Sequence, residues 1–187
     1  MSSTTLGAGA HDNDGLSGVA LRLHHEAYKC RNAEETRHFY EDILGLPLAQ
    51  SFQSRDRVSP AGDVVTSLYL SFRMRNGSYI VFFDLGDGKA PTPDPETPGF
   101  TTHFAMLVKD EECLQVLMRR LTAHGVPFQG PIEQQDYVRS VYLMDPNGLR
   151  LEFTYQLGEG MLDPDPAIHD RLSRDMLRSW VAEHQSD

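Results

Sequence analysis

The same order of local signals occurs twice in this sequence, and the repetition constrains the fold more than any other feature. In the first half, Asn32 is placed to cap a helix that ends at Gly45, and the extended segment GLPL begins there. In the second half, Asp110 is placed to cap a helix that ends at Gly125, followed by GVPF. Each helix follows a short strand-like run and precedes further strand-like runs. The chain therefore reads as two copies of one structural unit.

Apolar residues at helical spacing support both helices. Glu35, three residues after the first cap, also predicts a capping box there. The apolar positions of the first helix are Thr36, Phe39, Tyr40 and Ile43, and those of the second are Leu114, Leu117, Met118 and Leu121.

Each copy then continues into strands joined by a turn, MRNG at Met74–Gly77 and DPNG at Asp145–Gly148. The repeating unit is thus strand, helix, three strands. One helix cannot cover both faces of a four-stranded sheet, so the units must combine. We expect an α+β fold in which two βαβββ modules form one cupped mixed sheet, with the helices outside, a cavity inside and an extra C-terminal helix.

The predicted boundaries follow from the repeat and from a proline- and glycine-rich stretch between its copies. We expect a disordered tail at 1–18, a paired βαβββ domain at 19–157 and a C-terminal helical extension at 158–187. Within the paired domain, the first module spans 19–85, the linker 86–100 and the second module 101–157.

Composition limits the classes of partner. The 187 residues carry a net charge of −10, which argues against nucleic acid or an anionic membrane as the partner. The two cysteines, Cys30 and Cys113, are far apart and form no CxxC pair, so a reducing compartment is expected. No apolar run reaches the roughly 18 residues of a membrane-spanning helix. We expect a cytoplasmic protein that acts on a small molecule.

Three residues suggest a metal site. His25 and His103 occupy equivalent places in the two copies, and Ala27 and Ala105 follow each of them on the same strand face. The last strand of the second copy carries a lone acid, Glu152, among apolar residues. Two imidazoles and one carboxylate with open coordination positions point first to Fe(II), while Zn, Ni and Mn also suit these ligands.

Ordinary alternatives exist for each of these residues. His25 could be a core histidine, and Glu152 could be an outward-facing acid on an edge strand. His24 is expected on the opposite face, although a register shift of one residue would exchange it with His25. Val81 stands in the first copy where Glu152 stands in the second, so three protein ligands are expected.

The two units, together with HFYEDILGLPL and DPNGLRLEF, resemble the vicinal oxygen chelate superfamily over roughly Val19 to Gln156. This superfamily includes glyoxalase I, extradiol ring-cleaving dioxygenases and fosfomycin and bleomycin resistance proteins. The three-ligand set is similar to that of the extradiol enzymes, and Tyr142 matches their tyrosine that donates a hydrogen bond to a metal-bound catechol. The resemblance also implies a homodimer.

The sequence departs from the extradiol pattern at two histidines. Glu133, Gln134 and Gln135 stand where one histidine is expected, and Ser78 and Tyr79 stand where the other is expected. Ring cleavage requires proton transfer, so another group would have to serve or the reaction would differ.

The functional hypotheses are therefore three. The first is a metal-dependent extradiol-type ring-cleaving dioxygenase with Tyr142 in the active site. The alternatives are a glyoxalase-like lyase or isomerase and a metal-free small-molecule-binding protein of the resistance type. Arg150 shares a strand face with Glu152 and either binds an anionic substrate or forms an outer salt bridge. The sequence names neither the substrate nor the metal.

Overall fold

The computed structural model describes residues 22–91, 100–134, 137–157 and 166–184. The predicted tail at 1–18 and most of the predicted linker lie outside these ranges. In chain order the elements are β1 (His25–Cys30), α1 (Ala33–Arg37), η1 (His38–Ile43), β2 (Leu48–Val58), β3 (Val64–Arg73), β4 (Tyr79–Asp84), β5 (Phe104–Leu107), α2 (Glu111–Ala123), β6 (Phe128–Gln134), β7 (Val138–Met144), β8 (Arg150–Gln156) and α3 (Pro166–His184).

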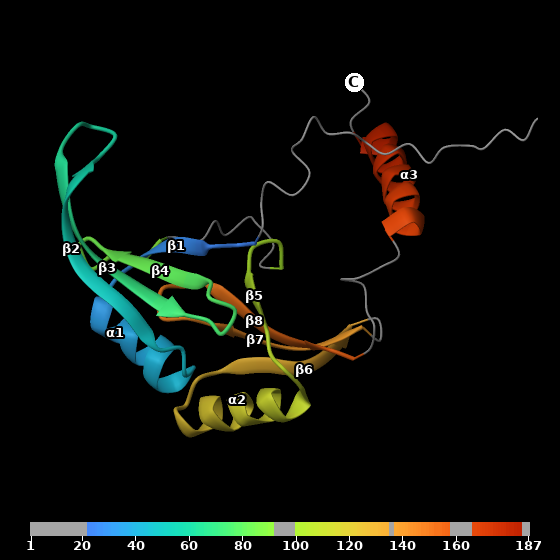
Figure 1. The fold of residues 1–187 in the computed structure, drawn as a ribbon, viewed down its shortest axis with the longest axis horizontal. Helices are drawn as coiled ribbons and strands as arrows, with labels where there is room; N and C mark the ends of the chain where they lie inside the picture. The colour runs from blue at the N-terminus through green and yellow to red at the C-terminus, as the bar shows by residue number, and fades with distance from the viewer. Residues whose placement is uncertain (1–21, 92–99, 135–136, 158–165, 185–187) are drawn as a thin grey trace, which may run out of the picture.

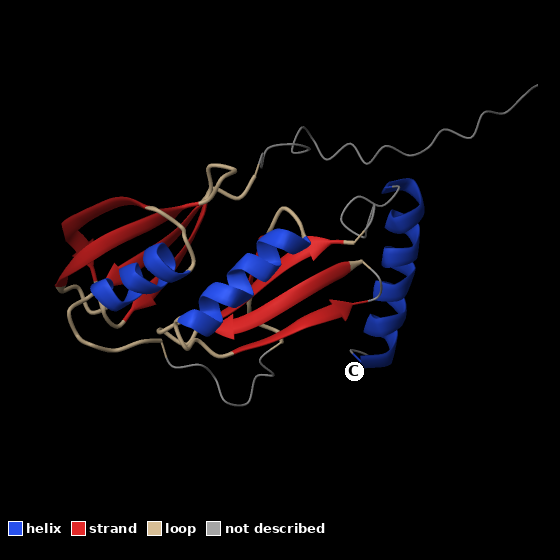
Figure 2. Cartoon of the chain, turned by 90° about the horizontal axis from the view of Figure 1, so that it is seen from below, coloured by secondary structure: helices blue, strands red, loops and turns tan. Residues whose placement is uncertain are grey.

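Each copy of the repeat forms its own four-stranded mixed sheet, with strand orders β1-β4-β3-β2 and β5-β8-β7-β6. In each sheet the first strand of the module runs parallel to the last, and the other neighbours are antiparallel. The helices α1 and α2 cover the same side of the two sheets (Figures 1 and 2). The predicted α+β class with two βαβββ modules is therefore confirmed, with one hydrogen-bonded sheet per module.

Side-chain caps start both helices at the predicted residues. Asn32 Oδ1 accepts a hydrogen bond from Glu35 N at 2.8 Å, and Asp110 Oδ1 accepts one from Cys113 N at 2.9 Å. The capping box predicted at Glu35 is only half formed. Its carboxylate accepts a bond from Arg31 Nε at 2.7 Å, because a charged donor competes better for it than the backbone does.

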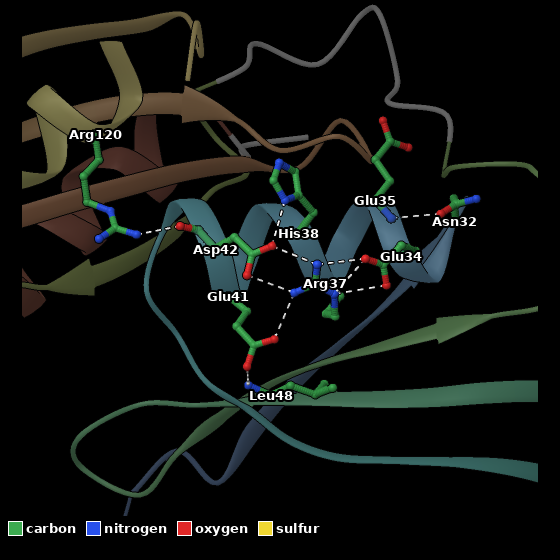
Figure 3. Close-up of polar contacts among 9 residues, drawn as sticks. All are labelled: Asn32, Glu34, Glu35, Arg37, His38, Glu41, Asp42, Leu48 and Arg120. Atoms are coloured by element: carbon green, nitrogen blue, oxygen red, sulfur yellow. Dashed lines mark hydrogen bonds and ion pairs between the residues drawn. The ribbon is translucent and has the colours of Figure 1, made fainter. Parts of the chain in front are cut away.

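The first helix changes to π-helical hydrogen bonding in η1, where the sequence predicted a continuous α-helix. Leu44 N donates to Phe39 O at 3.0 Å, five residues back. Arg37 also bridges to the carboxylate of Asp42, five residues on, at 2.8 and 3.0 Å (Figure 3). This spacing brings the two side chains onto one side of the wider helix. Gly45, with φ of +78°, then ends the helix as predicted.

A single apolar cluster joins the two modules. In the first module, the ring of Tyr40 lies 5.2 Å from Phe72 and 4.8 Å from Phe82. In the second module, Leu121 and Leu151 are fully buried in the same cluster. The core therefore extends across the seam between the sheets, on the side that the helices cover.

The DPNG turn of the second module packs against the first helix of the first module. Tyr40 Oη donates to Asp145 Oδ2 at 3.0 Å, Arg31 N donates to Asn147 Oδ1 at 3.0 Å, and Asn147 Nδ2 donates to Thr36 Oγ1 at 3.2 Å. Asp145 and Asn147 are only 5% and 4% exposed. Burial raises the pKa of the Asp145 carboxyl, and the donors from the turn and from Tyr40 oppose that shift.

A second contact across the seam comes from α2. Arg120 Nε donates to Ile43 O at 2.8 Å, and Arg120 Nη2 donates to Asp42 O at 2.5 Å (Figure 3). These carbonyls lie at the end of η1, where helical partners are missing, and a cation there is favourable. The first helix is thus held at its start and at its end by groups from the second module.

The C-terminal helix α3 lies apart from both sheets (Figure 1). On its described part, Met176, Leu177 and Trp180 are 71%, 62% and 56% exposed. No helix within the described residues has the length and apolar character required to cross a membrane.

Replacing Tyr40 with Phe should destabilise the protein by about 1–3 kcal/mol, because the buried Asp145 carboxylate would lose a hydrogen-bond donor. Urea unfolding followed by circular dichroism measures the change. Tyr137→Phe is the matched control, since Tyr137 is 41% exposed. Equal midpoints for the two variants would contradict a stabilising role for the buried bond.

Candidate functional site

The candidate site lies on the face of the second sheet that is turned away from α2, which we call the open face. Leu151 and Phe153 belong to the core on the helix side. Because side chains alternate along a strand, Glu152 must point to the open face. Ala105 of β5 pairs directly with Glu152 of β8. His103 lies two residues before Ala105, on the same side of the strand, and contacts Glu152 on the open face.

His103 and Glu152 are in direct contact, with Nε2 3.0 Å from Oε2. The other ring nitrogen of His103, Nδ1, lies 3.0 Å from the carbonyl oxygen of Phe100 and must donate a proton to it. In a neutral imidazole, Nε2 then carries a lone pair that faces the lone pairs of the carboxylate. That arrangement is stable only with a proton or a metal cation between the two atoms.

Glu152 is held from its other side by the neighbouring strand. Ser140 Oγ, which is fully buried, donates to Glu152 Oε1 at 2.6 Å and lies 2.9 Å from Thr154 Oγ1. The carboxylate is 8% exposed, so these partners replace the water that it has lost. Ser140 therefore helps to fix the orientation of Glu152.

Tyr142 pairs directly with Glu152 across β7 and β8. Gln134 Nε2 donates to Tyr142 Oη, and the ring of His103 lies edge-on to the Tyr142 ring at 6.4 Å. Burial and the charge of Glu152 raise the pKa of the Tyr142 phenol, so it remains protonated at neutral pH. Tyr142 can therefore donate a hydrogen bond to a ligand beside Glu152.

The donor set fits a metal at two of the three predicted positions. Two ligands about 2.1 Å from one ion and at right angles to each other lie about 3 Å apart, which is the separation of His103 Nε2 and Glu152 Oε2. A metal-bound histidine also typically donates its other N–H to a backbone carbonyl, as His103 does to Phe100.

His25 lies at the equivalent place in the first module. Ala27, two residues on, pairs with Val81, as Ala105 pairs with Glu152 in the second module. His25 is exposed, and its Nδ1 lies 2.8 Å from Nδ1 of His24. The described part of the chain contains no group of three or more histidine, cysteine or acidic side chains arranged to hold a metal. Convergence of His25 with His103 and Glu152 therefore stays a prediction.

Two residues of this site were not singled out as contacts by the sequence reasoning, namely Ser140 and Gln134. The hairpin could have indicated the first, because pairing Tyr142 with Glu152 around the DPNG turn also pairs Ser140 with Thr154. The sequence marks Gln134 only as standing where a histidine is expected, and the structure adds that its amide donates to the Tyr142 hydroxyl.

The fold and the site together define a class: an α+β protein of paired βαβββ modules with a histidine–carboxylate pair on an open sheet face. A family model described as the Glyoxalase/Bleomycin resistance protein/Dioxygenase superfamily matches residues 22–153. The chain belongs to this superfamily, as its resemblance to vicinal oxygen chelate proteins implied. None of the curated proteins matches the sequence.

Solved structures with similar folds agree. A glyoxylase/bleomycin resistance protein/dioxygenase domain from Frankia sp. EAN1pec is 20% identical, with TM-score 0.57 and coverage of 73% of this chain and 91% of that one. A glyoxalase/dioxygenase from Nostoc punctiforme is 21% identical, with TM-score 0.53 and coverage of 83% and 99%. TnmS3, an antibiotic binding protein from Streptomyces sp. CB03234, is 16% identical, with TM-score 0.51 and coverage of 74% and 98%. At these identities the likeness shows the fold alone.

Ser140→Ala should lower the stability of the metal-free protein by about 1–3 kcal/mol, because it leaves the buried Glu152 carboxylate without its strand donor. Denaturant unfolding of chelator-treated protein measures this effect. Ser51→Ala, at an exposed position of β2, is the control. If both variants matched the wild type, the bond between Ser140 and Glu152 would not be supporting the site.

Proposed function

We propose that the protein is a metal-dependent enzyme in which His103 and Glu152, joined by His25, hold a divalent metal, Fe(II) in the first place and Zn, Ni or Mn otherwise. The observation that carries the proposal is the 3.0 Å approach of two electron-pair donors, one fixed by Phe100 and the other by Ser140. A buried carboxylate of this kind is costly unless a cation or a proton offsets its charge.

A bound metal would supply Lewis-acid stabilisation of negative charge on two vicinal oxygens of a small substrate. The chain's own residues would do the remaining work. Ser140 keeps Glu152 in place, and the protonated Tyr142 donates a hydrogen bond to a substrate oxygen. Gln134 orients the Tyr142 hydroxyl through the amide hydrogen that it donates.

For the reaction we favour extradiol-type cleavage of a catechol-like ring, because the ligand types and Tyr142 match that group. Gln134 favours the alternative of a glyoxalase-like lyase or isomerase. An amide can donate a hydrogen bond but cannot accept and return a proton, as the histidine expected at this place would.

A metal-free binding protein is the second candidate class, and the first module favours it. On the open face of its sheet, Phe52 stacks on Tyr69 at 4.5 Å, and Tyr69 meets Phe83 edge-on at 5.5 Å. Phe52 is 49% exposed, so a flat molecule could stack on this row. The superfamily likeness extends to an antibiotic binding protein, TnmS3.

We also propose that the protein is cytoplasmic and forms a homodimer. Its two cysteines are both free, Cys30 buried and Cys113 exposed, which suits a reducing compartment. The dimer rests on the superfamily resemblance and on no contact within this chain.

His103→Ala should abolish metal binding while leaving the fold intact, because it removes one of the proposed ligands from a partly exposed position. Metal content after reconstitution with Fe(II) under anaerobic conditions, together with circular dichroism, measures both. His25→Ala should also lower metal content, whereas His124→Ala, at the end of α2, should not. Full metal stoichiometry in His103→Ala would overturn the assignment.

Tyr142→Phe should lower turnover by roughly 10²–10³ while changing substrate affinity little, because the hydroxyl would act mainly in the transition state. Oxygen consumption by the Fe(II) form across a panel of catechols measures turnover. No uptake with any catechol, together with conversion of a 2-oxoaldehyde conjugate by the Ni(II) or Zn(II) form, would transfer the proposal to the glyoxalase-like reaction. A protein that takes up no metal would transfer it to the binding class.

A further inference from the structure

A small pocket of 210 Å³ lies beside Tyr142, where β6 begins, β7 ends and β8 begins. Its walls include Pro127 just before β6, Phe128 and Gln129 at the start of β6, and Tyr142, Met144 and Arg150 from β7 and β8. Pockets for drug-sized ligands have volumes of roughly 300–1,000 Å³. This pocket therefore suits a small ligand or one end of a larger one, and most of its walls are apolar.

Arg150 is the charged residue in the lining of this pocket, and its charge has no carboxylate partner among the described residues. Its guanidinium carbon lies 4.8 Å above the centre of the Tyr142 ring, and its Nε is buried without a hydrogen-bond partner. Other arginines of this chain differ. Arg37 contacts Asp42 at 2.8 Å, and Arg139 contacts Glu133 at 2.7 Å.

An unsatisfied, buried guanidinium N–H costs free energy that a bound anion would recover. A carboxylate is the anion that best fits, because its two oxygens match the planar donor fork of arginine. The cation–π contact with Tyr142 restrains the side chain, so less freedom is lost when an anion binds. The tyrosine ring is common to the pocket and to the candidate centre, since Tyr142 pairs with Glu152.

We propose that this pocket binds the carboxylate of the substrate, with Arg150 as the residue that sets specificity. The inference rests on the proposed function, because it places the reacting oxygens at His103 and Glu152 and the acid group beyond Tyr142. The substrate class is then a small aromatic acid that carries its vicinal oxygens at one end and its carboxylate at the other. Neutral analogues of the same shape are poor ligands.

The test uses benzoate and benzamide, which share a ring and differ in charge. Binding is measured by ¹H–¹⁵N NMR titration of the full chain, as purified and again after metal removal and exchange into chelator-free buffer. We expect benzoate to bind at least about tenfold more tightly than benzamide in both forms, since a charge-assisted bond is roughly twice as strong as a neutral one. The largest shifts should fall at Phe128, Gln129 and Met144.

Arg150→Gln should remove the preference for benzoate, and Arg150→Lys should keep part of it. Arg119→Gln, at an exposed position of α2, should leave it unchanged. His103→Ala should also keep the preference in metal-free protein, which separates this proposal from the metal centre. Equal affinity for the two probes, no binding of either, shifts confined to other regions, or an unchanged preference in Arg150→Gln would each overturn it.

Discussion

The buried DPNG turn is the contact on which the relative placement of the two modules depends. Asp145 and Asn147 are polar groups with almost no access to solvent, and their partners Tyr40 and Thr36 are fully buried. Inside a protein such a network is strong when every member is satisfied and costly when one is not. The first helix and the second sheet therefore have one favourable arrangement, and the open faces of both sheets follow from it.

The seam is not symmetric, although the sequence repeats. In the first module Met74 stands where Asp145 stands in the second, and it packs against the apolar core. Asn76 Oδ1 accepts bonds from Ser78 N at 3.0 Å and Ser78 Oγ at 2.6 Å, within its own turn. Among the residues that the structure describes, the side chains of the second turn donate and accept across the seam, and those of the first turn do not.

The same divergence separates the two open faces. Val81 and Ser71 pair in the first module at the places that Glu152 and Tyr142 occupy in the second. The first module carries the aromatic row of Phe52, Tyr69 and Phe83 on its open face, and the second carries the polar centre. The two copies can differ on their open faces because the apolar core that both sheets need lies on the helix side.

The sequence predicts those features that depend on local patterns or on the repeat. The caps Asn32 and Asp110 and the histidine–carboxylate pair of the second module all follow from local patterns or from the repeat. The π-helical η1 did not follow, because its backbone bonds run five residues back, whereas apolar periodicity indicates only that a helix forms. The place of His25 depends on how two sheets meet, which is set by long-range contacts such as the DPNG turn.

The chemical role open to Glu152 depends on one contact of its neighbour His103. A buried carboxylate beside a histidine can be a simple ion pair, with the proton on the imidazole. The carbonyl of Phe100 accepts a hydrogen bond, so Nδ1 of His103 must carry a proton. Nε2 then either shares a second proton with Glu152 or presents a lone pair beside it. If the proposed metal binds between these two atoms, it replaces a proton there, so its affinity should be lower at low pH. In either state the strand donor Ser140 bonds the other carboxylate oxygen, so Glu152 stays oriented toward Nε2 of His103.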